Sequence, residues 1–250
     1  MIVLEEEDFL PIKSHSLKDV FIERFEALIL SGKFSPGDRV PSERDLGVLF
    51  GISRPVVHEG LRALESRGLV TIESRKGVRV NDYRKEGSIE MLLSLLNYSG
   101  GKLSQSLFDG ILEMRILFEV ETAGLAAKRR SDENLSDLLG LLQKEGSLGT
   151  YQAREVSDLD FEFHVAIAIA SGNQIYPLLM NSFKKIYKDI LEDFYADVSV
   201  IEPVFSYHRV IVASISEHDE LGARSAMRAL LRYSETNLRR ILFGQRAPAL

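Results

Sequence analysis

The stretch that decides the fold is residues 34–82, which read FSPGDRVPSERDLGVLFGISRPVVHEGLRALESRGLVTIESRKGVRVND. Ser42 stands just before a short helical pattern, as a residue that caps a helix does. Gly51 is typical of the end of such a helix. Ser53 then begins a second pattern, with Pro55 in its first turn, where the missing N–H of proline is tolerated. The stretch therefore predicts two short helices joined by a tight turn.

The apolar residues predict which sides of these helices are buried. They are Leu46, Leu49 and Phe50 in the first helix, and Val57, Leu61 and Leu64 in the second. Residues 69–72 and 78–80 read as strands around the basic turn Ser74-Arg75-Lys76-Gly77. An amphipathic helix that begins at Leu17 and ends by Gly32 precedes them. This order predicts a helix-turn-helix followed by a β-hairpin wing.

The start of the second helix, at Ser53 and Arg54, has the chemistry of a nucleic-acid contact. Backbone N–H groups and the helix dipole attract phosphate there, and an arginine can pair with guanine in the major groove. The net charge of the chain is −6, but Arg39–Val80 contains eight Lys or Arg against five Asp or Glu. DNA binding needs positive charge only where phosphates lie. The alternative is a small helical subdomain with merely solvated arginines.

The composition sets further limits. The chain has 250 residues and no cysteine, so disulfides and thiolate metal sites are excluded. No apolar run approaches the roughly 20 residues that span a bilayer. The N-terminal residues MIVLEEEDFL carry acid where a signal peptide has Lys or Arg. These features predict a cytoplasmic protein without a membrane segment.

Beyond the polar stretch Asn81–Ser88 the pattern is helical throughout, with breaks such as Ser99-Gly100-Gly101. The expected fold class is mainly α, with an N-terminal winged helix-turn-helix and an antiparallel all-α bundle. We predict a DNA-binding domain over 1–82, a linker and connecting helix over 83–104, and a bundle over 105–250. Residues 159–170 fit a strand or a helix, and their alanines favour the helix.

On a helix, Asp160 and His164 stand at positions i and i+4, so both side chains lie on one face and can reach one metal ion. A hydrogen-bonded pair of core residues would explain the same spacing. His208, at the start of another helical pattern, is a further candidate ligand.

The motifs PGDRVPSERDLG, FGISRPVVHEGLRALESRGLV and RKGVRV resemble those of the GntR family of bacterial winged-helix regulators over about Leu17–Val80. The resemblance implies that eight residues contact DNA: Arg44, Ser53, Arg54, Pro55, Val56, His58, Lys76 and Gly77. His58 stands where members often have Arg, so a different operator preference is expected.

Three later segments, LEMRILFEVETAGLAAKR, DFEFHVAIAIASGN and YHRVIVASISEHDELGARSAMRALL, resemble the all-helical effector domain of the FadR subfamily, the FCD domain. The resemblance implies a divalent metal, zinc or a similar ion, held by Asp160, His164 and His208. A fourth histidine of the family falls on Leu230, which weakens the site. Other members of the subfamily use no metal and fill the cavity with a large apolar ligand.

The same resemblance implies that Arg115 and Asn173 bind the effector. A guanidinium group suits a carboxylate, so the effector is expected to be a small acid. An ion pair between Arg115 and Glu113 or Glu119 is the alternative.

Together these features predict a homodimeric regulator of operator DNA that a small effector controls. A metal-dependent enzyme that uses Asp160, His164 and His208 is the alternative function, and a helical scaffold protein is a third. Because no nucleophile motif, phosphate loop or dinucleotide fingerprint occurs, we predict that the protein is not an enzyme.

Overall fold

The computed structural model describes residues 16–98, 105–149 and 152–244. The chain forms two compact units, Met1–Lys102 and Leu103–Leu250. The predicted break at Ser99–Gly101 and the acidic N-terminal stretch lie outside the described residues.

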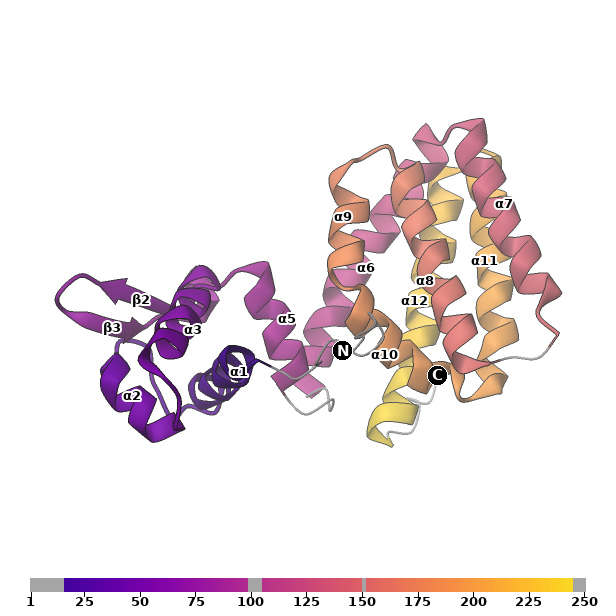
Figure 1. Cartoon of the computed structure of the whole chain (residues 1–250). Coiled ribbons are helices and arrows are strands. Elements are labelled where there is room, and N and C mark those ends of the chain that lie inside the picture. Colours follow the sequence, from indigo (N-terminus) through magenta and orange to yellow (C-terminus); the bar gives the residue numbers. More distant parts are fainter. Residues whose placement is uncertain (1–15, 99–104, 150–151, 245–250) are drawn as a thin grey trace, which may run out of the picture. The chain divides into compact units, whose positions relative to one another are not determined.

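The first unit combines helices with a small sheet (Figure 1). Its elements are α1 (Leu17–Leu30), β1 (Arg39–Val40), α2 (Glu43–Phe50), α3 (Arg54–Ser66), β2 (Val70–Glu73), β3 (Gly77–Val80), α4 (Tyr83–Glu86) and α5 (Ile89–Tyr98). The sheet is antiparallel in the order β1-β3-β2, and Val70 pairs with Val80. The predicted helix-turn-helix and hairpin are confirmed. Strand β1 was not predicted from the sequence.

The ends of α2 follow the predicted capping. The Ser42 hydroxyl accepts a hydrogen bond from the Asp45 N–H, and Gly51 ends the helix in the left-handed conformation with φ 66°. Ser53 is the N-cap residue of α3, but its side chain makes no capping hydrogen bond. The expectation for Leu49 is wrong, because its side chain is 72% exposed whereas Leu46 is 1% exposed. In a helix of only eight residues, Leu46 and Phe50 alone reach the core.

Two glycines of the first unit allow close packing that a side chain would prevent. A Cβ atom added to Gly60 in α3 would lie 2.3 Å from a ring carbon of Phe21 in α1. At Gly68 it would lie 1.9 Å from the Glu86 carbonyl oxygen, at the end of α4. Both distances are far shorter than an ordinary van der Waals contact of 3.4–4 Å. The end of α3 therefore lies directly against α4.

Helix α5 is also attached to this unit. The Arg67 guanidinium, just after α3, is ion-paired with the buried Glu26 carboxylate of α1 and donates a 3.2 Å hydrogen bond to the Ser94 hydroxyl of α5. Met91 of α5 is buried in the same hydrophobic cluster as Phe21. The segment after the hairpin is therefore packed against the winged helix by both polar and apolar contacts.

The second unit is a bundle of helices (Figure 1). The helices are α6 (Gln105–Arg129), α7 (Asp132–Ser147), α8 (Ala153–Ala170), α9 (Ile175–Ser182), α10 (Lys184–Tyr195), α11 (Ile201–Ser216) and α12 (Glu220–Phe243), with a short 3-10 turn η2 at Val198–Val200. Packed neighbours form a closed ring in the order α12, α6, α8, α7 and α11, and α10 packs against α8. One apolar core fills this ring. The predicted all-α bundle is confirmed.

Helix α8 covers the segment that fitted either a strand or a helix, so the choice of helix is confirmed. Among the described residues, Val198–Ser216 has the length and apolar composition of a membrane-crossing helix. This segment is also a core element of the bundle, since Val204, Phe205 and Ile211 are at most 1% exposed. Such burial is what a central helix of a bundle requires.

Candidate functional site

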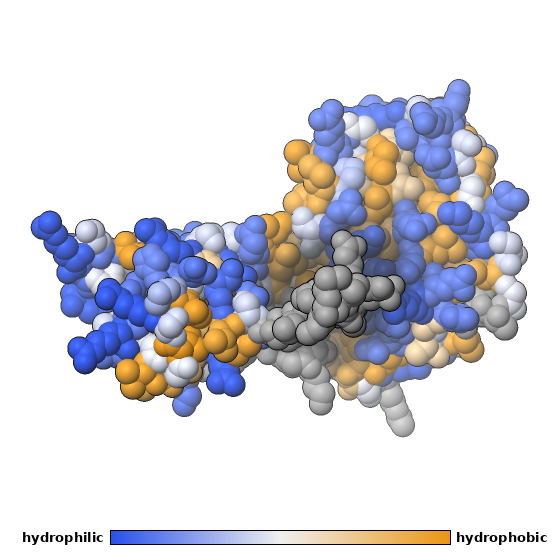
Figure 2. Space-filling model, in the orientation of Figure 1, coloured by the Kyte–Doolittle hydropathy of each residue, from blue (hydrophilic) through white to orange (hydrophobic). Residues whose placement is uncertain are grey.

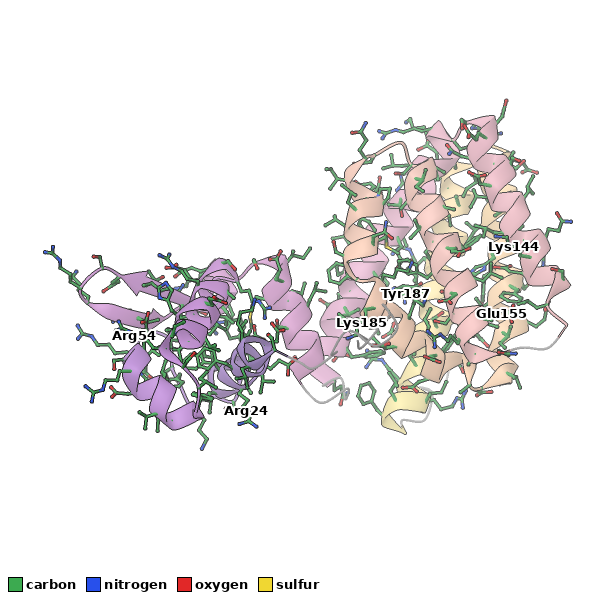
Figure 3. The ribbon with its side chains drawn as sticks, in the orientation of Figure 1. Arg24, Arg54, Lys144, Glu155, Lys185 and Tyr187 are labelled. Carbon is green, nitrogen blue, oxygen red and sulfur yellow. The ribbon has the colours of Figure 1, made fainter. Side chains whose placement is uncertain are left out.

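The predicted DNA-contact residues are exposed on the first unit. Arg44, Ser53, Arg54, Pro55, His58, Lys76 and Gly77 are all exposed, and Val56 is half-buried. Arg54 is labelled in Figure 3, and its side chain is 75% exposed. The residues come from α2, from the N-cap and start of α3, and from the turn between β2 and β3 together with the first residue of β3. The opposite side of α3 packs into the core through Val57, Leu61 and Leu64.

Glu43 connects two of these side chains. Its carboxylate lies 3.0 Å from Arg54 Nε and 2.6 Å from His58 Nδ1. The hydrogen bond with His58, followed by that with Arg54, lowers the pKa of Glu43 below its usual value. The first turns of α2 and α3 are thus joined at their exposed ends.

The wing is formed by a three-residue turn, Ser74–Lys76, between β2 and β3. Arg75 adopts a left-handed conformation there with φ 62°, and Gly77 follows with φ 95°. Both basic side chains of this turn, Arg75 and Lys76, are exposed. In Figure 2 the end of this unit that carries the hairpin is strongly hydrophilic.

The second candidate site lies inside the bundle, where Asp160, His164 and His208 meet. Donor atoms of the three residues lie within 4.8 Å of one another, and all three side chains are buried. His164 Nε2 is 3.9 Å from Asp160 Oδ2, and His208 Nε2 is 3.5 Å from Asp160 Oδ1. Helix α8 contributes the first two residues at i and i+4, and α11 contributes the third.

Two glutamates orient the two histidines. Glu119 Oε2 of α6 lies 2.5 Å from His164 Nδ1, and Glu145 Oε1 of α7 lies 2.6 Å from His208 Nδ1. Each histidine therefore turns its Nε2 toward Asp160. A carboxylate on the far nitrogen is the usual arrangement behind a metal-binding histidine, because it fixes the ring and its tautomer. The His208 Nε2 atom is buried without a hydrogen-bond partner among the described residues.

Asp160 also accepts hydrogen bonds from α10. Tyr195 donates to Oδ1 at 2.6 Å, and Tyr187 donates to Oδ2 at 3.0 Å. Burial raises the pKa of both tyrosines well above the usual value, so the phenols stay protonated and act as donors. The carboxylate is held in one orientation that faces the two histidines.

Arg115 lies beside this cluster and is ion-paired with Glu119. Its Nε is 2.5 Å from Glu119 Oε1, and one of its terminal nitrogens donates to the Tyr187 hydroxyl at 2.9 Å. Burial would raise the pKa of Glu119, but Arg115 and then His164 lower it to about 2. Burial would lower the pKa of His164, but the Glu119 carboxylate raises it. Of the two ion pairs considered for Arg115, the structure has the one with Glu119.

These residues suit a divalent cation. Three buried carboxyl groups, those of Glu119, Glu145 and Asp160, gather in the interior, and the Arg115 guanidinium is ion-paired with the first of them. One carboxylate and two imidazoles are a common ligand set for zinc. The Nε2 atom of His208, which has no hydrogen-bond partner among the described residues, is a buried polar atom that a bound cation would satisfy. Leu230 is 1% exposed and belongs to the apolar core, so it offers no fourth ligand.

Asn173 lies outside this cluster, in the turn between α8 and α9. Its side-chain oxygen accepts a hydrogen bond from the Ile175 N–H at 2.9 Å, and its own N–H donates to the Ser171 hydroxyl. Helix α8 continues for ten residues beyond Asp160, or about 15 Å, before this turn begins. A contact with an effector stays a prediction for this residue.

Three partners of the cluster were not predicted from the sequence, namely Glu145, Tyr187 and Tyr195. They come from helices far apart in the chain, and their own spacing carries no signal. Glu119 was noted only as an ion-pair partner of Arg115, although it occupies a position on the buried side of α6 next to Val120 and Ala123. A charged residue within an apolar helix face is the feature that could have identified it.

Comparisons with known proteins agree on the class. The model of the "Bacterial regulatory proteins, gntR family" matches residues 18–80, and the "FCD domain" model matches residues 110–233. The HTH-type transcriptional regulator Mce2R of Mycobacterium tuberculosis is 31% identical over 238 residues, which cover 94% of this chain and 97% of the relative. The fatty acid metabolism regulator protein of Proteus mirabilis is 27% identical, over 83% of this chain and 84% of its own length.

A solved structure from Listeria monocytogenes, of Lar, described as controlling expression of the agr system, has the same fold. The TM-score is 0.59 at 16% identity, and the match covers 92% of this chain and 99% of that one. The fold and these matches together define a transcription regulator with a DNA-binding domain and an effector domain. The chain belongs to the GntR family and carries the FCD effector domain. This membership favours the regulator over the enzyme alternative.

Proposed function

We propose that this regulator acts as a cytoplasmic homodimer that binds a palindromic operator through α3 and the wing. Helix-turn-helix dimers read two half-sites one helical turn apart, so the symmetry of the protein matches that of the operator. The observation that carries the proposal is the exposed start of α3, where Arg54 is not covered by the rest of its unit. The proposed domains are residues 1–82 for DNA, 83–104 for the connection and 105–250 for the effector.

Within the DNA-binding domain we assign base and phosphate contacts to Arg54, His58 and the first turn of α3. Arg44 and the wing residues Lys76 and Gly77 are assigned to the sugar–phosphate backbone. Ser53, Pro55 and Val56 complete the surface that enters the groove. The exposure of the charged residues supports this assignment.

Operator binding of an Arg54→Ala variant tests this assignment. Losing a bidentate contact with guanine costs about 1–3 kcal/mol of discrimination. Arg24→Ala is the matched control, because Arg24 is an exposed arginine on α1 that the proposal does not use (Figure 3). Operator and non-specific duplex are titrated over a range of salt concentrations. Unchanged specificity in Arg54→Ala would contradict the assignment.

In the effector domain we propose that Asp160, His164 and His208 hold a divalent metal, zinc or a similar ion. The ion would supply a Lewis-acidic position for an effector oxygen. Glu119 and Glu145 hold the imidazole rings, and Tyr187 and Tyr195 hold the carboxylate. Three protein ligands leave coordination positions for water or for the effector.

The metal content of the purified protein tests this site. His208→Ala is expected to bind zinc at least tenfold more weakly than the unsubstituted chain, since one of three ligands is lost. His218→Ala is the control, because His218 bonds the Ala127 carbonyl and is not a proposed ligand. Equal zinc content in all three proteins, loaded and dialysed in parallel, would contradict the proposal.

The effector we propose is a small carboxylate that Arg115 recognises. A buried guanidinium that carries two polar partners, Glu119 and Tyr187, is placed to exchange one of them for a ligand. Arg115→Lys keeps the charge but loses the planar fork. Small mono- and dicarboxylic acids should raise the melting temperature of the unsubstituted protein more than that of this variant. An equal rise in both would count against Arg115.

A further inference from the structure

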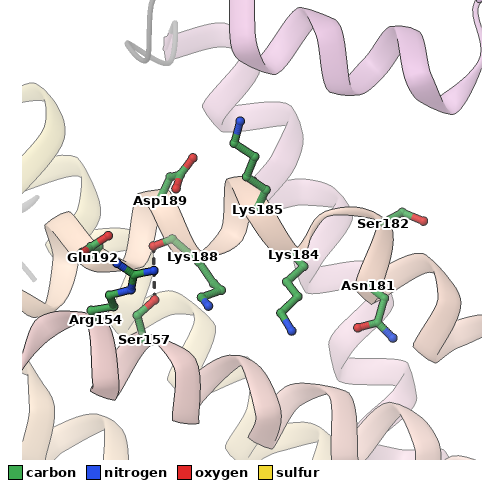
Figure 4. Close-up of a pocket in the computed structure, with 9 residues that line it drawn as sticks. All are labelled: Arg154, Ser157, Asn181, Ser182, Lys184, Lys185, Lys188, Asp189 and Glu192. Atoms are coloured by element: carbon green, nitrogen blue, oxygen red, sulfur yellow. Dashed lines mark hydrogen bonds between the residues drawn. The ribbon is translucent and has the colours of Figure 1, made fainter. Parts of the chain in front are cut away.

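A pocket lies on the outside of the effector domain, between α8 and α10 (Figure 4). Its volume is about 570 Å³, which falls within the range of small-molecule sites. Four cationic side chains line it, against the two carboxylates of Asp189 and Glu192. The cations are Arg154, Lys184, Lys185 and Lys188. A local excess of positive charge is unexpected in a chain whose net charge is −6.

The side chains divide into two sets by direction (Figure 4). Lys184 and Lys188 extend from α10 toward α8, and Arg154 faces them from the first turn of α8. Lys185 and Asp189 extend from the other side of α10. The spacing explains this division, because residues four apart share one face of a helix.

Most of the positive charge in the pocket is not neutralised. Within residues 16–98, 105–149 and 152–244, no carboxylate lies at ion-pair distance from Arg154, Lys184 or Lys185, whereas Lys188 is paired with Asp158. The Lys184 ammonium lies 5.5 Å from the ring centre of Phe161. The first turn of α10 contains two lysines and no acidic residue, although a helix N-terminus disfavours cations.

We propose that this pocket binds a small phosphate-bearing anion. Arg154 offers a planar guanidinium fork and Lys184 a point charge, which is a suitable pair for two anionic oxygens. The Asn181 amide lies at the same pocket and offers a neutral donor. The positive ends of α8 and α10 add to the attraction.

The site also lies close to the interior cluster. Phe161 packs edge-on against Tyr187, with ring centres 5.3 Å apart, and the Tyr187 hydroxyl bonds Asp160. In the sequence of α10, Tyr187 lies between Lys184 and Lys188. A bound anion would therefore touch the outer side of α8, which carries Asp160 and His164, and of α10, which carries the two tyrosines that hold Asp160.

Calorimetric titration of the full chain with pyrophosphate, at constant ionic strength in chloride, tests the proposal. We expect saturable binding that Lys184→Gln and Arg154→Gln each weaken about tenfold, which is the usual value of one charge-assisted contact. Lys144→Gln removes the same charge from an exposed side chain of α7 that does not line the pocket, and should change the affinity by less than about twofold. All of these side chains are exposed, so the variants should fold.

Absence of binding to the unsubstituted chain would overturn the proposal, and so would an equal loss in Lys144→Gln. Tighter binding of citrate than of pyrophosphate would overturn the assignment to phosphate. His208→Ala should retain pyrophosphate binding, because this pocket does not depend on the interior cluster. Failure of the metal proposal would leave this result unchanged, so the two are distinguishable.

Discussion

Replacing Gly60 of α3 by alanine should destabilise the winged helix, although alanine is the better helix former. The added Cβ atom would lie 2.3 and 2.7 Å from two ring carbons of Phe21. The ring cannot move aside freely, because it is 1% exposed and packs against Phe25 and Phe50 with centre distances of 5.6 and 5.0 Å. Normal carbon contacts of about 3.5–4.0 Å would require a shift of more than 1 Å.

Two opposing terms set the size of the effect. Overpacking of a core costs about 1–3 kcal/mol, and removing a helical glycine returns about 0.8–1.0 kcal/mol. Because the added methyl group would meet a rigid aromatic ring, we expect an overpacking cost in the upper part of this range. The free energy of unfolding should therefore fall by about 2 kcal/mol. Gly140→Ala in α7 is the control. No atom lies within 4 Å of its added Cβ, so it should gain about 1 kcal/mol.

Amide hydrogen exchange read by mass spectrometry separates the two units, which a global unfolding curve does not. Gly60→Ala should speed exchange in α1 and α3 and leave α6–α12 unchanged. Adding Phe21→Leu should restore part of the protection, because a smaller side chain leaves room for the methyl group. Two results would refute this reasoning. One is unchanged protection from amide exchange in Gly60→Ala, and the other is strictly additive effects of the two substitutions on that protection.

Three further outcomes follow from the buried charges. Glu145→Gln should weaken zinc binding about 10- to 100-fold in a competition titration, because the residue orients His208; an unchanged affinity would exclude that role. The pKa of Glu119 is about 2, well below the usual 4.5. At pH values above 4.5 the ionised carboxylate therefore stabilises the fold. That contribution, about 3 kcal/mol, is lost as the pH falls through 2, and acid unfolding of Glu119→Gln should lack it. Glu26→Gln should lower the free energy of unfolding of the first unit by about 2 kcal/mol. This loss is smaller than that for a fully buried ion pair, because Arg67 is partly exposed. An unchanged free energy of unfolding in urea would contradict this prediction.

The parts of the fold that the sequence predicted are those specified by neighbouring residues. Ser42, Gly51 and Pro55 act within one or two turns of backbone, and the structure has helix ends at each of these positions. The two-residue strand β1 exists only because it pairs with β3, so no local pattern announces it. Leu49 shows the limit of periodicity, because a short helix does not bury every apolar residue on one side.

The candidate metal site was predictable in its ligands but not in its surroundings. Asp160 and His164 share one helix, so their spacing alone places them together. The orientation of His208 depends on Glu145, 63 positions away in the sequence. Tyr187 and Tyr195 reach Asp160 only because α10 packs on α8. Contacts of this kind depend on the assembled bundle, and no single helix pattern specifies them.

The close approach of Gly68 to the Glu86 carbonyl has a practical consequence for chimeric regulators. Helices α4 and α5 are packed on the winged helix. A fusion joined directly after the hairpin would therefore remove Met91, and with it part of the hydrophobic cluster of this unit. It would also leave the Arg67 and Glu26 pair without Ser94. Sensors that combine this DNA reader with a foreign ligand-binding module should therefore retain the chain through Tyr98 and place the junction beyond it.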